Sequence, residues 1–271
     1  MWMIHMKTTK RKYGFKLSRP GELEQYVPRF SAARELPLPA FSAEMERMGI
    51  GPLDQGDKGA CVCFSGVKLA AFIAKKTHPE TDLPKFSPYF TYYNIRKAQI
   101  AAGELNSIDE DEGATGYEFM QSGKKDGLCP WDLWAPVEEN YAAEPTDAAK
   151  AAAMDHQVLT SKVLPLSISG LRIGMNDEGS PAQIGMLVPP ELESEEVEKT
   201  GILESIADLT LANNLGGHEV LLCDFLMKDG RLWVKLQNNW GRDWGKKGYW
   251  EMPATLLAKL LLEARLMIAI E

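Results

Sequence analysis

The stretch from Asp54 to Ser65 places a glutamine six residues before a cysteine that opens an apolar, helix-forming run. A helix that begins at Cys61 leaves unpaired backbone N–H groups and the positive end of its dipole near the sulfur. Both features favour a thiolate over a thiol. A glycine-bearing loop separates Gln55 from Cys61, so the glutamine amide could stand beside the Cys61 N–H at a developing oxyanion. These residues predict a nucleophilic cysteine with an oxyanion donor.

A nucleophilic cysteine needs a base, and the chain has four histidines. His218 has the most suitable setting, because two glycines lead into it and an apolar strand follows. His5 lies near the N-terminus, His78 precedes a proline after the first helix, and His156 falls in a polar stretch. His218 is therefore the predicted base.

A strand twenty residues beyond His218 runs into a turn rich in tryptophan and glycine, and Asn238 at that point could orient the imidazole. Three motifs thus occur in order: Gln-Gly-x-x-Gly-x-Cys, Gly-His-x-Val and Asn-x-Trp-Gly-x-x-Trp-Gly-x-x-Gly-Tyr. In this order they resemble the papain family of cysteine peptidases, over a range from about Tyr13 to the C-terminus. Other segments are similar to bacterial and phage members that lack a long propeptide.

The resemblance implies a role for each motif residue. Cys61 matches the nucleophile, His218 the general base, Asn238 the residue that orients the imidazole, and Gln55 the oxyanion donor. Trp240 matches the indole that shields the asparagine from water. The substrate-binding residues implied by the resemblance are Gly59, Gly113, Ala114, Gly217 and Trp240.

The local spacing also allows Cys63 as the nucleophile, although the distance from Gln55 favours Cys61. Neighbouring helix positions are about 100° apart, so Cys63 would point elsewhere. Val62 stands where the family usually has a tryptophan, and this change removes no catalytic group. A metal-binding role for Cys61 and Cys63 is disfavoured because no second Cys/His pair has a zinc-like spacing.

The resemblance implies an α+β, two-lobed papain-like fold within one catalytic domain. We expect an N-terminal extension over about 1–54, a helical lobe over about 55–155 and a β-rich lobe over about 156–271. The helical lobe should contain helices at 88–102 and 115–125 as well as the Cys61 helix. The segment 174–214, rich in proline and acidic residues, is predicted to be an insertion or a lid over the cleft.

Composition is that of a globular enzyme, with 271 residues, 45% apolar and 25% charged. Four cysteines without an evident framework predict reduced thiols and a cytoplasmic location, with Cys129 and Cys223 as buried apolar side chains. No apolar run approaches the length that spans a bilayer, so no membrane partner is expected. A net charge of −8 argues against general nucleic-acid binding, although a basic cluster at Lys7–Lys12 could contact an anionic partner.

The predicted activity is hydrolysis of peptide bonds by an endopeptidase through a thioester, without a cofactor or a metal, on a protein or peptide substrate. An exopeptidase, an acyl transferase or a catalytically inactive binding protein on the same scaffold are the alternatives. Only about 54 residues precede Gln55, so no removable inhibitory domain is expected. Neither the side-chain specificity nor the oligomeric state follows from the sequence.

Overall fold

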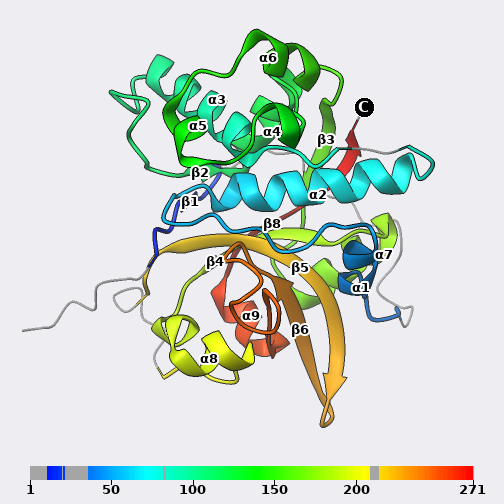
Figure 1. The fold of residues 1–271 in the computed structure, drawn as a ribbon. Coiled ribbons are helices and arrows are strands. Elements are labelled where there is room, and N and C mark those ends of the chain that lie inside the picture. Colours follow the sequence, from blue (N-terminus) through cyan, green and yellow to red (C-terminus); the bar gives the residue numbers. More distant parts are fainter. Residues whose placement is uncertain (1–10, 20, 22–35, 82–83, 208–213, 271) are drawn as a thin grey trace, which may run out of the picture.

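The computed structural model describes residues 11–19, 21, 36–81, 84–207 and 214–270. A long central helix, α2 (Cys61–Thr77), lies between a group of helices and a large twisted sheet (Figure 1). The helical side holds α3 (Pro88–Ala101), α4 (Gly116–Lys125), α5 (Glu138–Ala142) and α6 (Asp147–Ala153). This arrangement confirms the predicted α+β class.

Helix α2 begins at the predicted cysteine, and residues 61–74 are all buried. The preceding Ala60 supplies no side-chain cap, so the first N–H groups of the helix have no side-chain acceptor at that position. The predicted helices at 88–102 and 115–125 correspond to α3 and α4. Ser87 caps α3, and Thr115 and Glu118 form a capping box at the start of α4.

The large sheet has six strands in the order β3-β8-β4-β5-β6-β7, and all neighbouring strands are antiparallel. Its strands are β3 (Val158–Val163), β4 (Ala182–Leu187), β5 (Gly217–Lys228), β6 (Arg231–Gln237), β7 (Tyr249–Pro253) and β8 (Leu261–Ile270). Strands β5 and β8 pack directly against α2. The sheet thereby brings residues from the last third of the chain to the helix that carries Cys61.

Shorter elements complete the fold. A two-stranded parallel sheet joins β1 (Phe15–Lys16) to β2 (Ala114–Thr115). The remaining helices are α1 (Ser42–Arg47), α7 (Ile168–Glu178), α8 (Glu195–Thr200) and α9 (Ala254–Leu260), with short 3₁₀ turns at Trp131–Leu133 and Pro190–Glu193. Among the described residues no helix has both the length and the apolar character needed to cross a bilayer.

The prediction that 174–214 forms an insertion is wrong for residues 182–187. Strand β4 lies inside the main sheet, where it pairs with β5 on one side and β8 on the other. A six-residue strand that is buried along most of its length gives too short an apolar pattern to stand out between acidic and proline-rich flanks. Removal of the whole segment would therefore break the sheet. Residues 208–213 of the segment lie outside the described residues.

Candidate active site

Cys61 is the first residue of α2, and its side chain is completely buried. Backbone groups of Glu219, Gly14 and Val62 hydrogen-bond to the sulfur and lower the thiol pKa. Burial has the larger effect and raises the pKa of Cys61 to about 12, with the negative charge of Glu219 adding to it. In this state the thiol is protonated at neutral pH, in contrast to the thiolate that the helix start alone would favour.

His218 lies near the start of β5, and its side chain is also completely buried. Its Nε2 is 2.9 Å from Oδ1 of Asn238. The backbone N–H of Asn239 donates to the same oxygen at 2.8 Å, which identifies that atom as an acceptor. Nε2 therefore carries the proton, and Nδ1 keeps a lone pair. Within the described part of the chain, no hydrogen bond engages Nδ1.

Burial lowers the pKa of His218 to about 4. The bond to Asn238 opposes this shift, whereas the nearby charges of Lys68 and Arg11 add to it. The imidazole is consequently neutral at physiological pH. A neutral imidazole with a free Nδ1 lone pair can accept a proton from a neutral thiol.

Aromatic side chains pack around the imidazole of His218. Trp240 stacks on His218 with 5.0 Å between ring centroids and an interplanar angle of 23°. Trp244 packs edge-on against Trp240, and the Arg11 guanidinium lies 4.4 Å from the Trp240 ring centroid. This packing limits the rotation of the His218 ring and keeps water from the Asn238 contact.

Gln55 is buried and tied to both sides of the site. Its Nε2 donates to the Lys58 carbonyl at 2.8 Å, and its backbone N–H donates to the Asn239 carbonyl at 2.8 Å. An amide nitrogen has two hydrogens, so one remains for a developing oxyanion. Asp54 forms an isolated antiparallel β-bridge with Trp240, which lies just after β6. This bridge holds the loop before Cys61 close to Asn238.

Asn239 is a site residue that the sequence reasoning did not single out, because it occupies the variable position of the Asn-x-Trp motif. Its Nδ2 is within bonding distance of Cys61 O (3.3 Å), Ser65 Oγ (3.0 Å) and Glu219 O (2.8 Å). The side chain is fully buried. It thus connects the start of α2 to the strand that carries His218.

Replacing Asn239 with alanine is expected to remove one buried donor from the Cys61 and Glu219 carbonyls, at a cost of about 1–3 kcal/mol in the free energy of unfolding, although Ser65 Oγ still donates to the Glu219 carbonyl. The turnover number should fall while KM changes little, since the lost contacts orient Cys61 against His218 and touch no substrate. Urea unfolding and steady-state kinetics measure the two effects. Asn140→Ala is the control, because the Asn140 side chain donates to the Ala135 carbonyl at 2.8 Å, away from the site. An unchanged turnover number in Asn239→Ala would show that the contacts are purely structural.

The chain's own N-terminal segment crosses the site. The Gly14 carbonyl accepts a hydrogen bond of 2.7 Å from the Ala114 N–H. A Cβ atom at Gly14 would lie 1.8 Å from the Gly59 carbonyl oxygen, and one at Gly113 would lie 1.9 Å from the Gly14 carbonyl oxygen. Gly113 also has φ of +81°, a conformation that favours glycine. Gly14 therefore contacts three of the residues predicted to bind substrate.

The residues on either side of Gly14 are anchored as well. The Phe15 ring packs so closely on Gly185 and Gly217 that a Cβ at these positions would lie 2.2 and 2.9 Å from it. Tyr13 presents its ring edge to His218 at 5.8 Å between centroids, and its hydroxyl donates to Glu193. Further along, the Ser18 N–H donates to the Glu263 carboxylate at 3.0 Å.

The residues from Arg11 to Ser18 thus cover the cleft, and this explains why neither Cys61 nor His218 is exposed to solvent. The sequence predicts no removable inhibitory domain before Gln55, and the contacts of this short segment with the site residues were not anticipated. A separate domain is not needed, because one short stretch contacts all five predicted substrate-binding residues, with Tyr13 also lying 6.2 Å from Trp240 between ring centroids. Lys7 to Lys10 of the basic cluster lie outside the described residues.

A buried ionic cluster that the sequence did not indicate joins β5 to β8. One of its members, Glu263, also accepts the hydrogen bond from Ser18 of the N-terminal segment. Arg265 of β8 donates to the carboxylates of Glu219 and Glu263. Burial raises the pKa of Glu219 to about 7, although Arg265 acts against this shift. Because Glu219 directly follows His218, the cluster holds the start of β5 to β8 beside Cys61.

The other histidines and cysteines are placed away from this chemistry. His78 lies exposed at the end of α2, and the His156 ring packs against Phe86 at 5.1 Å. His5 lies outside the described residues. Cys129 and Cys223 are buried, as predicted, and Cys63 is buried too. Among the described residues no three His, Cys, Asp or Glu side chains form a potential metal-binding group.

Comparison with known proteins gives one clear relative by sequence. The chain is 30% identical over 220 residues to an uncharacterized peptidase C1-like protein of Acanthamoeba polyphaga mimivirus. The match covers 77% of this chain and 66% of the viral protein, which is just under two thirds of its length. No family model matches the sequence.

Solved structures share the fold over nearly the whole chain. Xylellain, a cysteine protease from Xylella fastidiosa, has a TM-score of 0.80 at 20% identity, with 97% of this chain and 99% of that chain covered. A procathepsin B from Trypanosoma congolense has a TM-score of 0.72 at 14% identity, with 96% and 86% covered. The shared fold shows that the chain has a papain-like architecture, and the viral relative links its sequence to a peptidase C1-like protein.

Proposed function

We propose that the chain is a cysteine endopeptidase that hydrolyses peptide bonds with Cys61, His218, Asn238 and Gln55. The observation that carries this proposal is the state of His218. Its Nε2 is held by Asn238, and its Nδ1 lone pair has no hydrogen bond within the described residues. A base in this tautomer, beside a helix that begins with a cysteine, is suited to take the thiol proton.

In the proposed reaction, Nδ1 of His218 accepts the Cys61 proton and the sulfur attacks the peptide carbonyl carbon. The new C–S bond gives an oxyanion, which the Cys61 N–H and the free N–H of Gln55 stabilise. The C–N bond then breaks as the imidazolium gives its proton to the leaving amine. Water, deprotonated by His218, hydrolyses the remaining thioester and releases the thiol.

The path of the N-terminal segment supports internal cleavage. Extended chain passes Cys61 in both directions, toward Arg11 and Trp240 on one side and toward Ser18 and Glu263 on the other. A cleft that accommodates the interior of a chain suits an endopeptidase better than an exopeptidase, whose cleft must end close to the nucleophile. The segment has to leave before a substrate can take its place.

A peptidyl epoxide that alkylates active cysteines provides the test, together with a peptide library analysed by mass spectrometry. Labelling of Cys61 and products cut at internal bonds are expected. Release of terminal residues alone would indicate an exopeptidase, and products joined to an added amine would indicate a transferase. Absence of both labelling and products, in a variant with the segment displaced, would leave a binding protein. A cytoplasmic location stays a prediction.

A further inference from the structure

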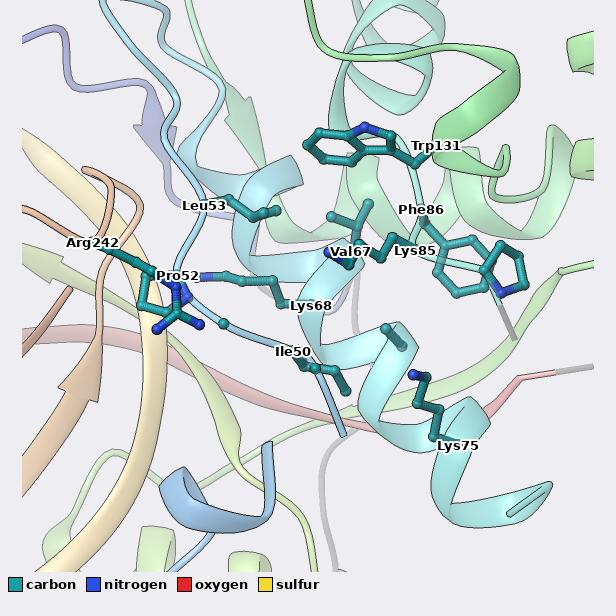
Figure 2. Close-up of a pocket in the computed structure, with 14 residues that line it drawn as sticks. Ile50, Pro52, Leu53, Val67, Lys68, Lys75, Lys85, Phe86, Trp131 and Arg242 are labelled. Atoms are coloured by element: carbon teal, nitrogen blue, oxygen red, sulfur yellow. The ribbon is translucent and has the colours of Figure 1, made fainter. Parts of the chain in front are cut away.

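A pocket outside the candidate active site lies between α2, the loop at Gly49–Leu53 and the turn near Trp131 (Figure 2). Four cationic side chains from separate parts of the chain line it, namely Lys68, Lys75, Lys85 and Arg242 (Figure 2). None of the described residues that line the pocket is acidic. In a chain with a net charge of −8, this is a local concentration of positive charge.

Lys68 is the least usual of these groups, because its side chain is only 3% exposed. Its Nζ donates to the Asn238 carbonyl at 3.0 Å, and no carboxylate pairs with it within the described part of the chain. An ammonium has three donors, so a neutral carbonyl satisfies only part of its capacity. Burial accordingly lowers the pKa of Lys68 to about 7. An anion in the pocket would offset the desolvation of this charge.

The other cationic side chains are not neutralised by the groups that they contact, apart from Arg242. Lys75 donates to the Met48 carbonyl at 2.8 Å, which is a neutral partner. Lys85 is exposed. Among the described residues, Arg242 is the one of these four that pairs with a carboxylate, that of Glu46, at 2.8 Å. Three lysines therefore line the pocket without an ion-pair partner among the described residues.

The remaining walls are apolar and include one large flat side chain. Trp131 lies opposite Leu53 and near Phe86 across the opening (Figure 2). Trp131 is partly exposed, so its ring surface is available to a ligand. Flat apolar surface beside positive charge is the combination that binds a small acid with an aromatic part.

We propose that this pocket binds a small molecule that carries an oxyanion, a phosphate monoester or a carboxylate, on an aromatic group. The oxyanion contacts the ammonium groups of Lys75 and Lys85, and the aromatic part packs on Trp131. Lys68, which lines the same pocket, donates to the Asn238 carbonyl. The pocket therefore adjoins the residue proposed to orient His218. The site is separate from the cleft that the N-terminal segment crosses.

The test is calorimetry with inorganic phosphate, phenyl phosphate and benzoate, at an ionic strength kept constant with chloride. We expect saturable binding of phenyl phosphate, and affinity losses of about tenfold in both Lys75→Met and Lys85→Met, because each removes one charge contact. Lys97→Met is the control, since Lys97 is an exposed lysine that pairs with Glu144 at 3.6 Å outside the pocket. Tighter binding of phenyl phosphate than of benzoate identifies a phosphate ligand, and the reverse order identifies a carboxylate.

Trp131→Ala separates the two parts of the ligand. It should weaken phenyl phosphate binding and leave inorganic phosphate binding unchanged, because only the aromatic ring contacts the indole. Lack of saturable binding by any of the three probes would overturn the proposal. So would equal affinities in Lys75→Met, Lys85→Met and Lys97→Met, which would indicate nonspecific attraction to the surface.

Discussion

Replacing Cys61 with alanine is expected to lower the turnover number by about 10⁶-fold, as removal of a covalent nucleophile does in other hydrolases. The variant has no atom that can form the thioester. Cys63→Ala should keep most of the activity, because Cys63 sits two positions further along the buried helix α2 and its side chain points in another direction. Peptide cleavage rates of both variants, with circular dichroism to confirm folding, give the measurement.

Labelling with iodoacetamide separates the two cysteines independently of turnover. Once the N-terminal segment is displaced, Cys61 should react first, since backbone N–H groups of Glu219 and Val62 reach its sulfur. Loss of activity in Cys63→Ala, together with full activity in Cys61→Ala, would reverse the assignment. It would also require an oxyanion donor other than Gln55, because the spacing of Gln55 fits a nucleophile at Cys61.

Replacing Gly14 with valine is expected to speed alkylation of Cys61 at pH 7 by about a hundredfold or more, because the thiolate is the reacting species. A Cβ at Gly14 would meet the Gly59 carbonyl oxygen at 1.8 Å, so the segment has to move off the cleft. In the covered state the pKa of Cys61 is about 12, and thiolate is about one part in 10⁵ at neutral pH. Solvent access removes the burial that causes this shift.

The pH dependence distinguishes uncovering from general loosening of the fold. In the original protein the alkylation rate should rise about tenfold per pH unit from pH 7 upward, because the thiol pKa lies far above that range. In Gly14→Val the rise should level off at a lower pH. Leu17→Ala is the control, because the Leu17 side chain is exposed within the same segment and anchors nothing.

A second variant uncovers the site without adding a side chain next to Gly59. It checks that faster alkylation in Gly14→Val does not come from distortion of the Gly59 loop. The double variant Tyr13→Ala and Phe15→Ala removes the two anchoring rings without adding any atoms. It should also speed alkylation of Cys61 and cleavage of short peptides. Unchanged rates in both variants, with the fold intact, would mean that the segment does not restrain the site.

The sequence by itself determined those features that depend on local pattern. The run of apolar residues after Cys61 defined the start of α2, and the apolar strands near His218 and Asn238 could be predicted from the sequence. Helices α3 and α4 were also predicted from the sequence, and the structure shows that their capping residues lie next to them in the chain, so they too depend on local pattern. The order of the three motifs also indicated which family the chain resembles.

Only the tertiary structure decided the features that depend on contacts between distant segments. Strand β4 is recognisable through its pairing with β5 and β8, and Asn239 gains its role by reaching Cys61 and Glu219 from another part of the chain. The cover over the cleft depends on Gly14 meeting Ala114, a hundred residues away. Such contacts leave no periodic signal in either segment, because each segment supplies only half of the geometry. Burial likewise sets the pKa values of Cys61 and His218, and burial is a property of the whole fold.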